Sequence, residues 1–123
     1  MIQDIVDKIN SKVIEFPFLE LSLLSFRDKE LIIAASEDFS YFHNFEMRFK
    51  NVFTIIGNID WKADTNKLLI QVIEGTEEAI NLNKKYRVEI GFTVFKLNNE
   101  EGDFFYIIAE NIELVDKVVK YYS

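Results

Sequence analysis

The single histidine of the chain, His43, is the side chain best suited to proton transfer near neutral pH. Groups that could orient this base or act as its nucleophile lie near it in sequence: Ser36, Glu37, Asp38, Ser40 and Glu46. Nucleophilic catalysis needs a serine held against the imidazole in space, and nearness in sequence gives weak support for that geometry. An enzyme that uses His43 stays open as a hypothesis, but no catalytic residue is predicted.

Alternation around His43 favours a structural role instead. Positions 41, 43, 45, 47 and 49 hold Tyr, His, Phe, Met and Phe, whereas Asn, Glu and Arg occupy positions 44, 46 and 48. Side chains alternate between the two faces of a strand, so His43 would share a face with Phe45. There, a neutral imidazole hydrogen-bonded to the backbone would close the rim of an aromatic core. We interpret His43 as this rim, because no motif around it marks an active site.

Metal and cofactor sites are not predicted. One imidazole and no thiol offer too few ligands for a typical transition-metal site. The acidic stretches 60–66 and 98–103 lack the spacing of a calcium-binding loop, and we interpret both as solvated turns. The four glycines are scattered singly, so no glycine-rich phosphate loop precedes a helix.

The first half of the chain predicts a helix followed by a hairpin. Apolar residues recur every three or four positions from Ile2 to Val13, which is typical of an amphipathic helix, and Pro17 marks its end. Residues 18–26 and 30–36 are mainly apolar and are separated by a short polar turn, which predicts two paired strands. The strand that carries His43 follows, with a bulge near Asn51 where the alternation shifts.

The second half predicts further strands. Residues 68–74 form one strand, residues 76–85 form either a short helix or a long connection, and residues 86–97 form a strand with the clearest alternation in the chain. After a turn, a last strand runs from Phe104 to about Leu114. The apolar spacing beyond it fits either a helix or a continued strand, and we favour a helical tail. The sequence thus predicts an α+β fold, in which an N-terminal amphipathic helix precedes a mainly antiparallel sheet of about six strands.

Composition sets the class of protein and of partner. A chain of 123 residues, 49% of them hydrophobic, is expected to form one domain over residues 1–123. Its net charge of −7 disfavours direct binding to nucleic acid or to an anionic membrane, and it favours a basic protein partner. The lack of cysteine, of a signal-peptide pattern and of a long apolar stretch predicts a cytoplasmic protein.

Seven residues are candidates for contact with a partner or ligand: Tyr41, His43, Trp61, Glu77, Glu78, Glu100 and Glu101. The two acidic pairs suit a basic partner. Trp61 could anchor an interface, although we favour a role in capping the sheet because tryptophan is mostly buried. Sheet edges, or the tyrosines Tyr121 and Tyr122, could also form a homodimer.

The stretches 41–52, YFHNFEMRFKNV, and 104–114, FFYIIAENIEL, resemble small bacterial proteins that are assigned as immunity proteins of polymorphic-toxin systems. The likeness lies in an aromatic-rich strand that ends in Phe-x-x-Val and in an acidic chain without catalytic residues. Such proteins bind a cognate toxin and block its active site. The resemblance therefore implies a non-enzymatic inhibitor, and no individual binding residue carries over.

Besides an enzyme that uses His43, the sequence is compatible with three functions. The leading hypothesis is a non-enzymatic protein-binding module, an immunity or antitoxin protein whose acidic surface covers a basic partner. The alternative is a small-ligand carrier, in which the sheet and the helix enclose an aromatic-lined cavity gated by His43 and Tyr41. A domain with a purely structural role is the remaining possibility.

Overall fold

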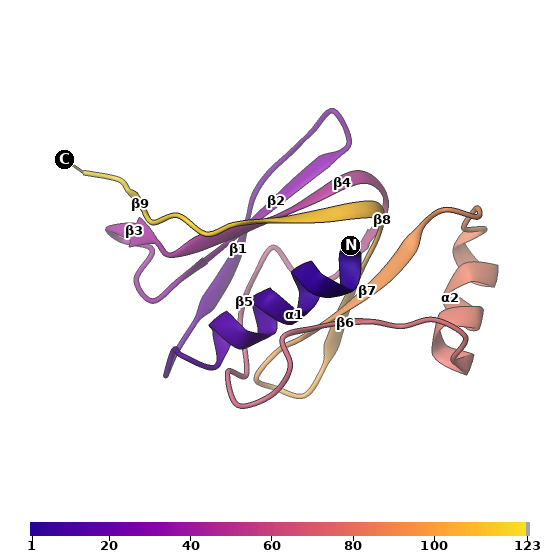
Figure 1. The fold of residues 1–123 in the computed structure, drawn as a ribbon, viewed down its shortest axis with the longest axis horizontal. Helices are drawn as coiled ribbons and strands as arrows, with labels where there is room; N and C mark the ends of the chain where they lie inside the picture. Colours follow the sequence, from indigo (N-terminus) through magenta and orange to yellow (C-terminus); the bar gives the residue numbers. More distant parts are fainter. Residues whose placement is uncertain (123) are drawn as a thin grey trace.

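The computed structural model describes residues 1–122, which form an N-terminal helix, a set of strands and a second helix in the second half of the chain (Figure 1). The two helices are α1 (Ile2–Val13) and α2 (Glu77–Tyr86). The strands are β1 (Glu20–Arg27), β2 (Glu30–Ser36), β3 (Phe42–His43), β4 (Phe45–Ile56), β5 (Asp60–Lys62), β6 (Ile70–Val72), β7 (Thr93–Asn98), β8 (Phe104–Val115) and β9 (Val119–Lys120).

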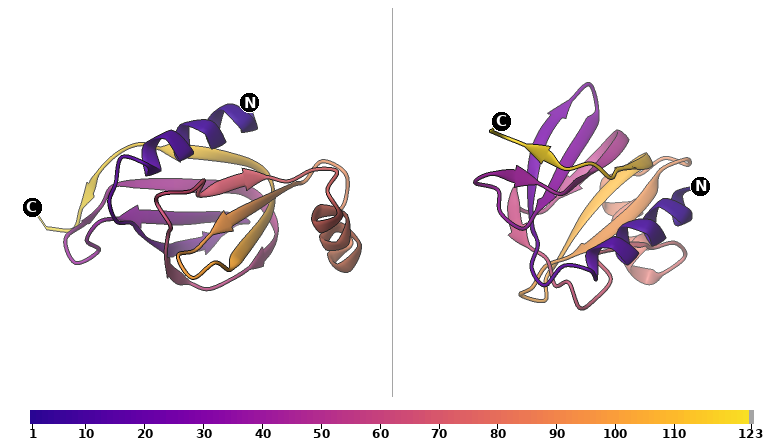
Figure 2. Two further views of the ribbon diagram at one scale, coloured as in Figure 1. Left: turned by 90° about the horizontal axis from the view of Figure 1, so that it is seen from below. Right: turned by 60° about the vertical axis from the view of Figure 1, so that its left-hand side comes forward.

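Seven strands form one sheet in the order β5-β1-β2-β4-β8-β7-β6, and every neighbouring pair in it is antiparallel. The sheet curls into a half-barrel with α1 lying across its concave face (Figure 2). β3 and β9 pair with each other as a separate two-stranded antiparallel sheet. This architecture confirms the predicted α+β fold with an N-terminal helix and a mainly antiparallel sheet.

The main core lies between α1 and the concave face. The apolar face of α1 buries Val6 and Ile9 in it. The sheet contributes Phe45, Phe49 and Phe95, and the last two rings meet edge to face with their centroids 5.2 Å apart. Burial of one such side chain contributes about 1.5–3 kcal/mol relative to leaving it exposed. These side chains belong to one continuous core cluster between α1 and the sheet.

Backbone geometry confirms two local predictions. Asp28 and Lys29 form the tight turn between β1 and β2 with positive φ angles of 51° and 63°, as a two-residue hairpin turn requires. Asn51 has a φ of 49°, and the register of β4 against β8 shifts just after Val52. This is the bulge that the break in alternation indicated.

The strand predicted over residues 86–97 is wrong in its first half. The Thr76 side chain caps α2 by accepting a hydrogen bond from the backbone N–H of Ala79 at 3.1 Å, and the helix continues through Tyr86. Arg87 then adopts a left-handed conformation with a φ of 55°, and β7 begins only at Thr93. Of the alternating apolar residues before β7, Val88 and Phe92 pack in a second, smaller core with α2, whereas Ile90 is fully exposed. The members of this core are Ile73, Ala79, Leu82, Val88, Phe92, Val94, Tyr106 and Ile108.

Of the two alternatives for the C-terminal segment, the helical tail that we favoured does not form, and the extended one does. β8 runs to Val115, one residue beyond the expected end, and the chain then stays extended into β9. Val119 lies opposite His43, and Lys120 lies opposite Phe42. Pairing with β3 satisfies the backbone here, so the helical spacing of the apolar residues after Ile112 does not decide the structure.

Both edges of the main sheet are short and covered. β5 and β6 have three residues each. On β6, the Asn10 side chain donates a hydrogen bond to the carbonyl of Ile70 at 2.8 Å and accepts one from its N–H at 3.1 Å. On β5, the carbonyl of Lys62 accepts a hydrogen bond from the N–H of Glu100 at 2.8 Å. These contacts occupy edge groups that a second copy would need in order to extend the sheet.

Candidate functional site

A pocket of about 320 Å³ lies where β5 meets the turn between β7 and β8. Three of the seven candidate contact residues meet there: Trp61, Glu100 and Glu101. Trp61 is far in sequence from the two glutamates. The full lining is Glu20, Asn58, Asp60, Trp61, Lys62, Asn99, Glu100 and Glu101. This hollow, named the acidic pocket from here on, is the candidate functional site.

Strands β1 and β5 position one wall of the acidic pocket. Glu20 pairs with Lys62, and Ser22 pairs with Asp60, across these antiparallel strands. Directly opposed residues project from the same face of a sheet, so Glu20, Asp60 and Lys62 lie on one face of β1 and β5. The Ser22 hydroxyl donates a hydrogen bond to the Asp60 carboxylate at 2.6 Å and orients it.

The turn between β7 and β8 forms the other wall. The Asn99 side-chain oxygen accepts hydrogen bonds from the backbone N–H groups of Glu101 at 2.9 Å and Asp103 at 3.2 Å. The N–H of Glu100 is bonded to the carbonyl of Lys62, which ties the turn to β5. The backbone that carries Glu100 and Glu101 is therefore fixed, while both side chains remain exposed.

Trp61 borders the acidic pocket but belongs mainly to the core. Its side chain is only 8% exposed, and its ring meets that of Phe105 edge to face with centroids 5.0 Å apart. Its indole N–H donates a hydrogen bond to the carbonyl of Asn98 at 3.0 Å. This is the capping role that we favoured for Trp61, and it leaves only a small part of the ring at the pocket.

Asn98 holds this region together, and sequence reasoning missed it. It is 5% exposed, and its amide nitrogen donates to the carbonyls of Asp64 at 3.2 Å and Leu68 at 2.6 Å. Its amide oxygen accepts a hydrogen bond from the N–H of Asp64 at 3.1 Å. Asn98 opens a polar stretch that is typical of a turn, so its local sequence gives no signal of this buried role.

The acidic pocket carries an excess of negative charge. Four carboxylates face one ammonium group, that of Lys62. Among the described residues, none of these four carboxylates lies within 4.0 Å of a lysine, arginine or histidine nitrogen, whereas Glu30, Glu46 and Glu78 elsewhere are paired in this way. A concave surface lined by one sign of charge attracts groups of the opposite sign.

The other predicted acidic pair lies away from the acidic pocket, on the first turn of α2. Glu77 is exposed, but Glu78 fastens the helix to the sheet by accepting hydrogen bonds from the Tyr106 hydroxyl and from Lys96, the latter at 3.0 Å. The bond from Tyr106 lowers the pKa of Glu78, and it outweighs the opposing effect of burial. Burial and the same bond raise the pKa of Tyr106 to about 12. Glu78 is thus part of the framework and is engaged internally.

His43 is 2% exposed, and its environment differs from the predicted one. Its Nε2 lies 2.7 Å from a carboxylate oxygen of Glu46, and its Nδ1 lies 2.8 Å from the Tyr121 hydroxyl. Both ring nitrogens therefore engage side chains, which corrects the expected hydrogen bond to the backbone. The nearby Ser36 hydroxyl donates to the carbonyl of Phe42 at 2.6 Å, so it does not form a nucleophile and base pair with His43.

Glu46 links His43 to the surface. Its second carboxylate oxygen accepts hydrogen bonds from Arg48, at 3.1 Å from Nε and 2.8 Å from Nη2. Burial acts to raise the pKa of Glu46, but the hydrogen bonds from Arg48 and His43 and the charge of Arg48 bring it below its ordinary value. Tyr41, the remaining candidate contact residue, is 61% exposed beside this group, and its carbonyl accepts a hydrogen bond from the N–H of Tyr121 at 2.9 Å.

Over residues 1–122, no group of three or more histidine, cysteine, aspartate or glutamate side chains is arranged to hold a metal ion. Neither α1 nor α2 is long and apolar enough to cross a membrane.

Comparisons with models of protein families, with curated proteins and with solved structures each found no match to this chain.

Proposed function

We propose that this chain is a non-enzymatic protein-binding domain whose acidic pocket receives a basic group of a partner protein. The observation that carries the proposal is the set of four carboxylates around one hollow without an ion-pair partner among the described residues. A hollow of about 320 Å³ accommodates one long basic side chain of a partner.

The rigid frame of the acidic pocket supports this role. Two contacts hold the backbone that carries Glu100 and Glu101 before a partner arrives. They are the backbone bond between Glu100 and Lys62 and the turn around Asn99. A partner then binds without having to order this turn, which reduces the entropic cost of association. Exposed carboxylates around the hollow also speed the encounter with a basic surface.

The kind of partner follows from charge and from the resemblance in sequence. The net charge of −7 favours a basic protein and disfavours nucleic acid and anionic membranes. Stretches 41–52 and 104–114 resemble immunity proteins, which block toxins. We therefore propose a toxin with a basic active-site region as the partner, and the cytoplasm as the place where the two proteins meet.

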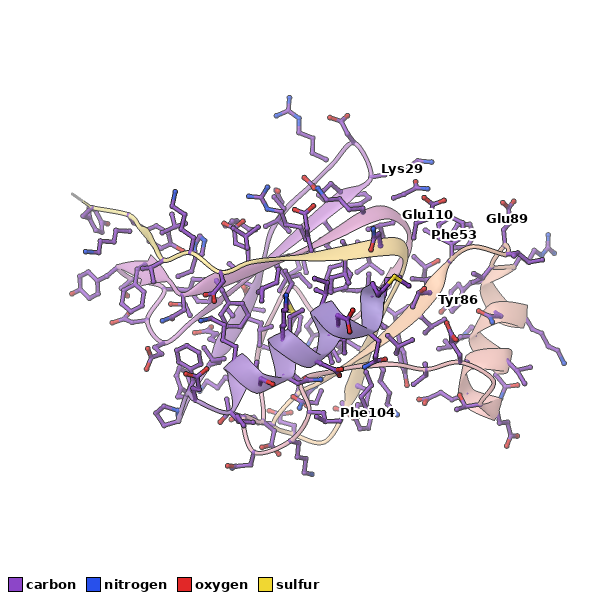
Figure 3. All side chains as sticks on the ribbon, in the orientation of Figure 1. Lys29, Phe53, Tyr86, Glu89, Phe104 and Glu110 are labelled. Atoms are coloured by element: carbon purple, nitrogen blue, oxygen red, sulfur yellow. The ribbon has the colours of Figure 1, made fainter. Side chains whose placement is uncertain are left out.

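The test compares two charge reversals of equal size. The pocket variant carries Glu100→Lys and Glu101→Lys, and the control variant carries Glu77→Lys and Glu89→Lys. Glu89 follows α2 at the end of the molecule opposite β3 and β9 (Figure 3). All four residues are exposed, so both variants are expected to keep the stability of the natural chain.

Tagged natural chain and both variants are used to capture proteins from a lysate of the source cells at low and high salt. At low salt, we expect the natural chain and the control variant to retain one basic protein and the pocket variant to lose it. At high salt, the natural chain should lose this protein too. With that protein purified, the pocket variant should associate at least about tenfold more slowly. Equal capture by the two variants, or no protein that depends on the pocket residues, would contradict the proposal.

A further inference from the structure

The segment Asp116–Tyr122, named the strap from here on, follows β8 and lies over His43 (Figure 1). β9 lies within the strap and pairs with β3, as β8 pairs with β4, in an antiparallel ladder. The register of the β3–β9 ladder differs by one residue from that of the β4–β8 ladder. Asn44 lies between the two ladders, and its N–H bonds to the carbonyl of Ala35 on β2 at 2.7 Å. The strap is thus a separate continuation of the sheet and not part of β8.

The direction of each hydrogen bond around His43 follows from its partners. An ionised carboxylate only accepts, so the Nε2–H of His43 donates to Glu46. In a neutral imidazole, Nδ1 then carries a lone pair, and the Tyr121 hydroxyl donates to it. The Tyr121 ring also lies against the imidazole, with centroids 5.7 Å apart. Tyr121 therefore supplies both a donor and an aromatic surface to His43.

The strap covers a buried group although none of its own residues is buried. Val119 is half-buried and the other strap residues are exposed, whereas His43 and Glu46 beneath them are 2% and 6% exposed. Besides the Tyr121 contacts and the two paired residues of β9, the strap is held by the ion pair between Lys12 and Asp116 at 2.7 Å. Segments with few buried apolar contacts open at low free-energy cost while the rest of a protein stays folded.

We propose that the strap opens as a unit, and that the position of the Tyr121 hydroxyl is a binding position for a phenolic group, which donates a hydrogen bond to His43 Nδ1. A phenol fits because it reproduces both parts of the Tyr121 contact, the O–H donor and the ring. Glu46 holds the imidazole in the tautomer that accepts, and Arg48 holds Glu46. This site is separate from the acidic pocket and does not depend on the function proposed for it.

Because the chain has one histidine, acylation by diethyl pyrocarbonate, located by mass spectrometry, reports on His43 alone. We compare the natural chain, Tyr121→Phe, and a chain that ends at Lys117, all at one pH and with the fold checked by circular dichroism. We expect slow acylation in the natural chain, about fivefold faster acylation in Tyr121→Phe through loss of one hydrogen bond, and the fastest acylation without the strap. Equal rates in the natural and shortened chains would overturn the proposal, as would a natural rate that rises with denaturant in parallel with global unfolding.

The binding position is tested in Tyr121→Ala, which leaves the space of the tyrosine side chain empty. We add p-cresol, which is the tyrosine side chain as a free molecule, and toluene, which has the same ring and methyl group but no hydroxyl. We expect p-cresol to slow the acylation of His43 in this variant and toluene to have little effect, with neither compound changing the rate in the natural chain at the same concentration. Equal protection by the two compounds, or no protection by p-cresol, would overturn the phenol site.

Discussion

The acidic pocket and the buried group around His43 contain the same kind of side chain in opposite conditions. Glu46 lies in the interior, where Arg48 and His43 use both of its oxygens. Glu100 and Glu101 are exposed, and the backbone beneath them is fixed while their carboxylates have no ion-pair partner among residues 1–122. In one place the charge stabilises the fold, and in the other it remains available to another molecule.

Hydrogen-bond partners distinguish a carboxylate that belongs to the framework from one that is exposed without an internal partner. Glu78 and Glu77 show the same contrast within a single turn of α2, because Glu78 binds Lys96 and Tyr106 while Glu77 is exposed. Charge alone made the four acidic candidates look equivalent in the sequence. Their hydrogen bonds separate them: Glu78 is engaged within the chain, whereas Glu77, Glu100 and Glu101 are exposed.

Trp61→Ala should give the largest effect, because the wall of the acidic pocket belongs to the core. Removal of this ring is expected to lower the free energy of unfolding by about 3–5 kcal/mol, through the cavity left beside Phe105 and the loss of the bond to Asn98. Urea unfolding, monitored by circular dichroism, measures this free energy. Tryptophan fluorescence is unsuitable because Trp61 is the only tryptophan. Trp61→Phe, which keeps a ring, should cost less. A cost below about 1 kcal/mol for Trp61→Ala would mean that the pocket wall is not part of the framework.

Glu46→Ala should have the next largest effect on stability. It leaves the buried Nε2–H of His43 without an acceptor, which costs about 1–3 kcal/mol. Glu46→Gln should cost less, because its amide oxygen still accepts from His43. Glu101→Ala is the matched change in the acidic pocket and should alter stability little. Similar costs for Glu46→Ala and Glu101→Ala in urea unfolding would remove the distinction between the two regions.

The pH dependence of stability should give the smallest effect and comes from the same carboxylate. The pKa of Glu46 is lower in the folded chain than its ordinary value of 4.5, so the unfolded chain binds a proton first as the pH falls. The stability that Glu46 contributes is therefore complete above that ordinary value and is lost as the pH falls through the lower folded pKa. The difference in unfolding free energy between the natural chain and Glu46→Gln should shrink over this range. A difference that grows on acidification would contradict the assignment.

Much of the fold was predictable because its signals are local. The apolar spacing of α1, the hairpin turn at Asp28 and Lys29, and the bulge at Asn51 each follow from a few neighbouring residues. The end of β8 was predicted to within one residue. The candidate site was predictable only in part: the acidic character of Glu100 and Glu101 was visible, but their meeting with β5 was not, because a backbone bond to Lys62 creates it.

The sequence by itself determined the class of the fold, the acidic charge and the presence of one histidine, since these depend on composition and on short-range periodicity. Tertiary structure decided the rest. Val88 and Phe92 pack in the smaller core with Ile108 of β8, and the strap pairs with β3, whatever their local pattern favours. The roles of Asn98, Glu46 and Tyr121 likewise depend on hydrogen bonds to groups remote in sequence or buried by the fold. A buried polar group must find a partner wherever the fold provides one, and no local pattern specifies where that is.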